Sequence, residues 1–172
     1  MTYLGDISLI DERISSVEDV LLSLNEHKKD TEWSIKTTDF AINHIKKFEQ
    51  KYNKNCAKGF LPKKYFFDIL LPSHGHLKDW ETGILLFPYN VSVEKALEYH
   101  KISNPLYTKD CLEMIDYFKD QIKNKGFTSR VIVEIIDNEL RHIDGLHRMI
   151  ALGLLLKEGY EYKPIPVYLL KR

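Results

Sequence analysis

The chain has few cysteines, no long apolar run and no net charge. Its two cysteines, Cys56 and Cys111, lie too far apart for a CxxC pair and show no Cys/His metal spacing, so neither a disulfide framework nor a zinc site is expected. No apolar stretch approaches the roughly 20 residues of a membrane-spanning helix. The first residues lack the basic and apolar segments of a secretory signal. We therefore expect a soluble, cytoplasmic protein without a membrane partner.

Charge is balanced overall, with 25 basic and 25 acidic residues, but it is unevenly distributed. Residues 28–64 carry ten basic and four acidic side chains, whereas residues 1–27 carry one basic and six acidic ones. The lysines between Lys46 and Lys64 could contact the phosphates of a nucleic acid or an acidic partner. A solvated helix face and loop is the interpretation that we favour for them.

Hydrophobic periodicity and turn residues predict a mixed α/β fold. Ser16 is a candidate N-cap with Asp19 at the capping-box position, Ser92 and Thr108 are further candidate caps, and Gly126 is a candidate helix stop. In the first three quarters of the chain we expect strands over 3–10, 65–71 and 84–87, helices over 17–27, 39–52, 93–100 and 109–123, and a loop over 53–62.

The last quarter of the chain gives the clearest pattern. A β-hairpin is predicted from strands over 131–136 and 140–143, joined by the two-residue turn Asp137-Asn138. The following helix, over 146–157, is apolar nearly all round and should be buried. Gly159 then ends this helix, and a last strand is expected over 165–170.

Between the hairpin and this apolar helix lies the sequence Asp144-Gly145-Leu146-His147-Arg148, called the DGLHR motif below. Asp144 and Gly145 supply a turn, and His147 and Arg148 then fall in the first helical turn. Two potential cations there oppose the helix macrodipole, whose N-terminal end is already partly positive. A bound anion would remove this cost, because free backbone N–H groups, a glycine and an arginine fork together form a phosphate cradle. Asp144 alternatively serves as a simple N-cap.

The segment from about residue 112 to residue 170 resembles the ParB/sulfiredoxin superfamily. The resemblance rests on a helix ending at Gly126-Phe127, the hairpin, the DGLHR motif, Gly159 and the strand Ile165-Pro166-Val167. It implies a ParB/sulfiredoxin-like mixed sheet with packed helices as a nucleotide-binding core over 101–172. Residues 1–100 are then expected to form an N-terminal extension that packs on this core as one compact unit and shapes substrate specificity.

In that family the motif binds nucleotide phosphates in partition proteins that use CTP, sulfiredoxins that use ATP and kinases of small molecules. Leu146 replaces the catalytic cysteine of sulfiredoxins and the glutamate of partition proteins, and no helix-turn-helix follows the motif. The resemblance therefore implies a nucleotide-dependent phosphotransferase that phosphorylates a hydroxyl of a small metabolite, using ATP or ADP (or CTP) with Mg²⁺. The alternative is a noncatalytic ParB-like regulator that binds a nucleotide or a nucleic acid.

On the kinase hypothesis each residue of the motif has an expected role. The amides around Gly145 hold a phosphate, Arg148 spans its oxygens, His147 donates a further hydrogen bond, and Asp144 holds the metal or orders the turn. A general base for the acceptor hydroxyl should be another carboxylate in the same pocket. The candidate bases are Glu134, Glu139, Asp79, Glu81 and Asp110.

Two further groups of residues are weaker candidates. Lys109 and Asp110 lie in the region where members of the family contact the nucleotide. His74 and His76, with Asp79 and Glu81, could form a transition-metal site. Short His-x-His pairs in loops are more often free of metal, so we do not favour this site.

Overall fold

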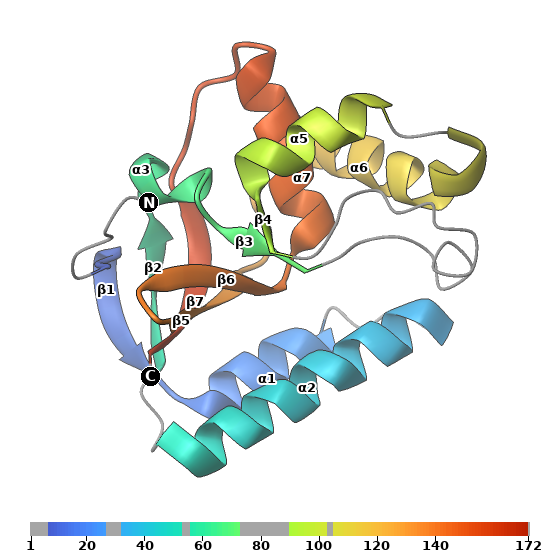
Figure 1. The fold of residues 1–172 in the computed structure, drawn as a ribbon. Helices are drawn as coiled ribbons and strands as arrows, with labels where there is room; N and C mark the ends of the chain where they lie inside the picture. The colour runs from blue at the N-terminus through green and yellow to red at the C-terminus, as the bar shows by residue number, and fades with distance from the viewer. Residues whose placement is uncertain (1–6, 27–31, 53–55, 73–89, 103–104, 172) are drawn as a thin grey trace.

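A computed structural model describes residues 7–26, 32–52, 56–72, 90–102 and 105–171 of the chain (Figure 1). These residues form a mixed α/β fold, which confirms the predicted fold class. The strands are β1 (Ile10–Ser15), β2 (Cys56–Leu61), β3 (Leu70–Leu71), β4 (Val91–Ser92), β5 (Val131–Ile136), β6 (Glu139–Asp144) and β7 (Ile165–Lys171). The helices are α1 (Val17–Glu26), α2 (Glu32–Tyr52), α3 (Lys63–Phe66), α5 (Val93–Ile102), α6 (Pro105–Lys125) and α7 (Leu146–Lys157).

All seven strands join one sheet in the order β1-β2-β7-β5-β6-β3-β4. The pairs β5/β7 and β3/β6 are parallel, and the other neighbouring pairs are antiparallel. The first hundred residues contribute strands on both sides of the C-terminal ones, because β2 pairs with β7 and β3 pairs with β6. Residues 1–100 and 101–172 therefore build the same sheet.

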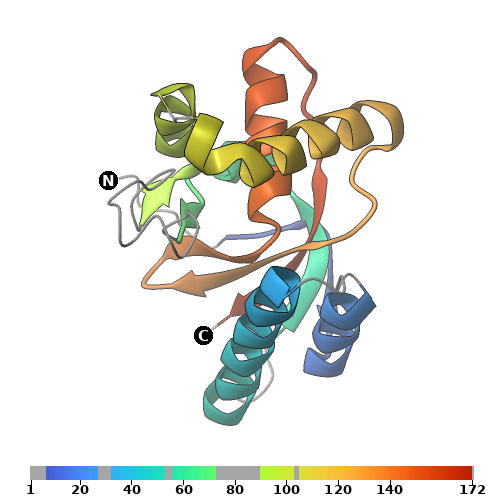
Figure 2. The same cartoon turned by 90° about the vertical axis from the view of Figure 1, so that its right-hand side faces the viewer.

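Helices cover both faces of the sheet (Figures 1 and 2). Helices α1 and α2 pack on one face, whereas α5, α6 and α7 pack on the other. Strand β5 shows the division, because Val131 and Val133 belong to the core beneath α7 and Ile132 belongs to the core beneath α2. This alternation follows from the period of two in a β-strand. Helix α7, predicted to be buried, has seven buried residues among its twelve.

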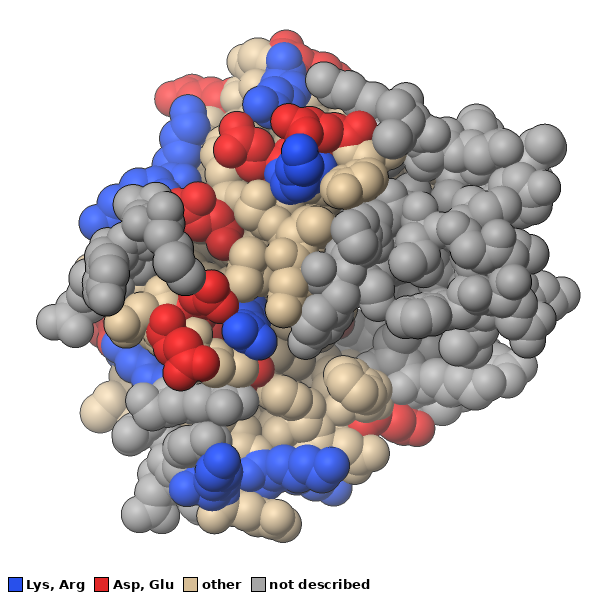
Figure 3. Space-filling model, in the orientation of Figure 1, with Lys and Arg blue, Asp and Glu red and all other residues tan. Residues whose placement is uncertain are grey.

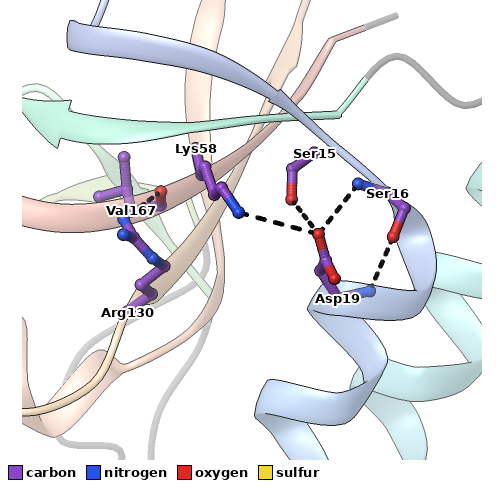
Figure 4. A network of polar contacts seen from close by, with 6 residues as sticks. All are labelled: Ser15, Ser16, Asp19, Lys58, Arg130 and Val167. Atoms are coloured by element: carbon purple, nitrogen blue, oxygen red, sulfur yellow. Dashed lines mark hydrogen bonds and ion pairs between the residues drawn. The ribbon is translucent and has the colours of Figure 1, made fainter.

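Several local predictions are confirmed by the structure. Ser16 Oγ accepts a hydrogen bond of 3.0 Å from the backbone N–H of Asp19, and Asp19 Oδ2 accepts one of 3.4 Å from the N–H of Ser16 (Figure 4). The capping box thus forms with aspartate in place of glutamate. Asp137 and Asn138 both have positive φ angles, 52° and 63°, as a two-residue type I′ hairpin turn requires.

Other predictions in the first half of the chain are wrong. The predicted loop over 53–62 contains β2. Its lysine and glycine interrupt the apolar pattern by which a strand is recognised in a sequence. Gly59 is needed there because a Cβ would lie 2.8 Å from the carbonyl oxygen of Ile10. The predicted strand over 65–71 instead begins in α3, and only Leu70–Leu71 is extended. A short buried apolar run does not distinguish a strand from a helical turn.

The remaining differences concern boundaries. The first described strand covers Ile10–Ser15 rather than 3–10. Helix α2 begins at Glu32, and α6 begins at Pro105, so Thr108 lies inside the helix rather than at its cap. The strand predicted over 84–87 lies outside the described residues. None of the helices in the described ranges is long and apolar enough to cross a membrane.

Candidate functional site

The DGLHR motif lies where β6 ends and α7 begins, and Gly145 determines the shape of this junction. Gly145 is the N-cap of α7 and has φ 100° and ψ 21°, a left-handed conformation that side chains disfavour. Its carbonyl oxygen accepts the first hydrogen bond of the helix, 3.0 Å from the N–H of Met149. A Cβ on Gly145 would lie 3.0 Å from both Arg148 Nη2 and Val131 Cγ2. Both conformation and space therefore require glycine.

The first turn of α7 has an electrostatic character that suits an anion. No side chain caps the helix, and its first turn contains no acidic residue. The first N–H groups of a helix have no partner within the helix and carry the positive end of the macrodipole. A phosphate at this position would be complementary to them.

Arg148 points inward and binds the protein itself. Its side chain is only 11% exposed. Nη1 donates to the carbonyl oxygens of Ser129 (3.2 Å) and Arg130 (3.3 Å) and to the Ser129 hydroxyl, and Nη2 donates to Asp144 Oδ2 at 2.8 Å. Arg148 thereby ties the start of α7 to the end of β6 and to the segment that precedes β5. The guanidinium that was expected to span phosphate oxygens is an internal clamp in this conformation.

The charges of this clamp influence one another. Burial lowers the pKa of the Arg148 guanidinium from its usual range, and the adjacent Asp144 carboxylate opposes that shift. The Asp144 side chain is 39% exposed, so it is accessible from solvent while it holds Arg148. His147 lies in the same first turn and is half-buried.

Among the described residues, the donor set fits Mg²⁺ as an ion shared with a bound phosphate. Within the described ranges, no group of three or more His, Cys, Asp or Glu side chains is placed to hold a metal. Mg²⁺ is commonly held by one or two carboxylates together with substrate phosphates and water, and Asp144 fits that pattern. His74, His76, Asp79 and Glu81 lie outside the described residues.

Glu134, a candidate base, faces the α2 side of the sheet. It is 3% exposed, and its Oε1 lies 3.0 Å from Nε2 of His44 on α2. Asp144 pairs instead with Ile132, two positions back along β5. Buried Ile132 and the partly buried Ile143 both belong to the α2-side core. Sequence reasoning missed His44, because it and Glu134 are 90 residues apart and share no motif.

Glu139, the other candidate base of the hairpin, lies at the opposite end of β6. It lies five positions before Asp144, about 17 Å along an extended strand. Glu139 Oε2 accepts a 3.0 Å hydrogen bond from Arg141 Nη2. Lys109 and Asp110 belong to α6, and their side chains lie outside the described residues. The structure thus gathers Asp144, Gly145, His147 and Arg148, whereas Glu134 pairs with His44 and Glu139 lies at the far end of β6.

Arg130, which the sequence did not single out, anchors the segment that Arg148 binds. Its Nη1 donates to the carbonyl oxygen of Val167 at 3.4 Å (Figure 4) and to that of Gly59 at 3.1 Å. Its guanidinium lies 5.5 Å from the ring centroid of Tyr168. Arg130 thereby joins β2 and β7 to the start of β5. The arginine before β5 and the arginine in α7 both stabilise this end of the sheet.

The lysines between Lys46 and Lys64 do not belong to one element. In the described ranges they are distributed over α2, β2 and α3. Lys58 lies 3.9 Å from Asp19, so acidic α1 partly neutralises it (Figure 4). Figure 3 shows acidic and basic side chains interspersed over the described part of one face, with basic residues gathered along its lower edge, over α2. This mixture does not form the continuous basic stripe of a nucleic-acid groove.

Comparison with known proteins gives no relative from which a function could be transferred. The chain matches no protein-family model, no curated protein and no solved structure.

Proposed function

We propose that this protein is a nucleotide-dependent phosphotransferase that binds nucleotide phosphates at the start of α7 and phosphorylates a hydroxyl of a small metabolite. The observation that carries the proposal is the junction itself, where a left-handed Gly145 opens a helix that no side chain caps. The resemblance of the DGLHR motif and its flanking elements to the ParB/sulfiredoxin superfamily supports the same assignment.

The proposed binding mode uses the backbone first. The N–H groups of the first turn would donate hydrogen bonds to a phosphate. Gly145 shapes this turn, because the position that its Cβ would occupy lies against Arg148 Nη2 and Val131 Cγ2. Arg148 would hold the turn in place through Ser129 and Asp144, and its positive charge would still favour an anion nearby. His147 would supply a further hydrogen bond.

Phosphoryl transfer depends mainly on positioning and on neutralising charge, and Mg²⁺ bound with ATP or ADP would supply part of that neutralisation. Among the described candidate carboxylates, Asp144 alone lies at the junction, so we assign it the contact with the metal or the acceptor. Glu134 and Glu139 have no part in this proposal because Glu134 is buried and paired with His44, and Glu139 lies at the far end of β6.

The test is an NMR titration of ¹⁵N-labelled protein with Mg²⁺-ATP. Binding at the proposed site should move the amide signals of Gly145, Leu146, His147 and Arg148 more than any others. The variant Arg148→Lys should weaken the response, whereas Arg141→Lys, a matched change on β6, should leave it intact. If millimolar Mg²⁺ with ATP, ADP or CTP moves none of the α7 amides, the binding proposal is wrong.

Transfer is tested separately from binding. Protein incubated with γ-labelled ATP and pooled small metabolites should yield a labelled acceptor, and Asp144→Asn should abolish that product. Nucleotide binding without any labelled acceptor, across pools rich in hydroxyl compounds, would contradict the phosphotransferase and leave a nucleotide-binding regulator.

A further inference from the structure

The outer surface of the α1–α2 layer carries features that neither the fold nor the proposed function uses. The two helices lie side by side, run in opposite directions and cover one face of the sheet (Figures 1 and 2). Val17, Val20 and Leu24 of α1 and Ala41, Ile45 and Phe48 of α2 are buried against the sheet. On the outside, Leu22 is 61% exposed and Phe40 is 74% exposed.

The exposed residues of α1 form an acidic column around Leu22. Glu18, Leu22 and Glu26 follow one another at intervals of four residues, so they lie on one face of the helix, and all three are exposed. The helix contains no lysine or arginine. Its outer surface is therefore one large apolar side chain between two carboxylates.

The exposed residues of α2 form the opposite pattern. Phe40, Lys47 and Lys51 recur at intervals of seven and four residues and are exposed along one side of the helix. Lys46 is exposed beside them and lines a shallow groove between the two helices, together with Leu21, Asn25, Asp39, Ile42 and Asn43. Lys46 thus lies at the groove, whereas Phe40, Lys47 and Lys51 lie about 100° further round α2, on the neighbouring flank of the helix.

We propose that this surface is the interface of a homodimer, in which α1 of one copy packs on α2 of the other. The charges of the two helices favour a second copy as the partner and determine its orientation. Acidic α1 of one copy attracts lysine-rich α2 of the other, whereas contacts of α1 with α1 or α2 with α2 would be repulsive. A twofold axis parallel to the helices places α1 over α2 of the second copy twice. An axis perpendicular to the helices would place α1 over α1 and bring like charges together.

The size of the surface is sufficient for a weak, reversible dimer. Helix α2 has 21 residues and is about 31 Å long. Helix α1 has 10 residues and is only about 15 Å long. With each helix about 10 Å wide, one copy offers about 450 Å² and the pair would bury about 900 Å². That total is below the roughly 1,200 Å² of stable specific interfaces and is typical of transient contacts. The dimer should therefore be weak, with a Kd on the order of 100 µM, and Phe40 should be its main apolar contact.

Sedimentation equilibrium from about 1 to about 200 µM tests the proposal. The wild-type chain should pass from 20.3 kDa toward twice that mass. Phe40→Asp, which alters both symmetric contacts, should raise Kd about 100-fold. Tyr117→Asp is the matched control, since Tyr117 is 50% exposed on α6 and lies outside this surface. Circular dichroism should show that both exposed substitutions leave the fold intact.

A charge exchange distinguishes this dimer from any other. Glu26→Lys and Lys47→Glu should each weaken self-association about tenfold, because each replaces two attractive contacts with repulsive ones. An equimolar mixture of the two variants should restore association, since each α1–α2 contact in the mixed dimer again joins opposite charges. A wild-type chain that stays monomeric, a dimer that Phe40→Asp leaves unchanged, or a mixture that does not recover would each overturn the proposal.

Discussion

Substitution of Gly145 by alanine gives a quantitative test of the junction, because the chain contains a matched glycine. Gly145 and Gly159 have φ angles of 100° and 92°, so alanine is strained at both positions. A Cβ at Gly159 would meet no atom within 4 Å, whereas one at Gly145 would lie 3.0 Å from Arg148 Nη2 and Val131 Cγ2. The difference between the two variants therefore isolates crowding at the site.

The expected magnitudes follow from these two contributions. The left-handed conformation costs alanine about 1–2 kcal/mol, and the loss of glycine's freedom in the unfolded chain returns about 0.4–1 kcal/mol. Gly159→Ala should thus lower the free energy of unfolding by about 0–1.6 kcal/mol. Gly145→Ala adds crowding against Val131 and the Arg148 guanidinium, and this should lower the free energy of unfolding by a further amount of about 1–3 kcal/mol.

Urea denaturation followed by circular dichroism measures both variants against the wild type. We expect Gly145→Ala to show the lower transition midpoint with an unchanged m-value, since the change acts on the folded state. Equal midpoints for Gly145→Ala and Gly159→Ala would refute the claim that Gly145 is needed for space as well as for conformation.

Three further predictions concern other parts of the molecule. Arg148→Met should lower the free energy of unfolding by about 2–4 kcal/mol, because it removes a charged donor from several acceptors. Urea denaturation measures this loss, and a loss below about 0.5 kcal/mol would contradict the role of Arg148 as a clamp. The hydrogen bonds from Ser15 and from the Ser16 backbone hold the pKa of the Asp19 carboxyl below its usual range. The stability that Asp19 contributes is therefore present above the unfolded pKa of about 3.9 and is lost as pH falls through the folded value. Asp19→Asn should accordingly flatten the acid limb of a stability–pH curve, and an unchanged limb would contradict this. Burial raises the pKa of the Cys56 thiol to about 11, so it should react with a disulfide reagent at pH 8 far more slowly in the native than in the urea-unfolded chain, and equal rates would show that it is exposed.

The sequence predicted those elements whose signals are local. The hairpin turn Asp137-Asn138, the Ser16 capping box and the apolar helix α7 depend on residues within a few positions of one another, and each is present. Strand β2 was missed because its pattern is not local. It is central between β1 and β7, and its glycine fits beneath Ile10 and Leu9, contacts that no periodicity reveals.

The site was predictable to the same extent. The motif gave the turn, the helix start and the residues that gather there. It did not give the direction of the Arg148 side chain, because that depends on carbonyl groups 18 and 19 residues earlier in the chain. Nor did it show that Glu134 would face α2, since strand alternation gives two faces without saying which helix covers each.

The position of Arg148 changes the electrostatic reasoning about the motif. Two cations at a helix start oppose the macrodipole, and that cost alone suggested an anion. In the folded chain Asp144 lies 2.8 Å from Arg148 and compensates its charge, so no ligand is needed to stabilise the arginine. A phosphate would instead be bound by the backbone N–H groups beside Gly145, which no side chain caps. A phosphate bound there would lie next to the Asp144 carboxylate, and a cation between the two would relieve their repulsion. Nucleotide affinity at this junction should therefore depend on Mg²⁺ far more strongly than it would at a helix start without an adjacent carboxylate.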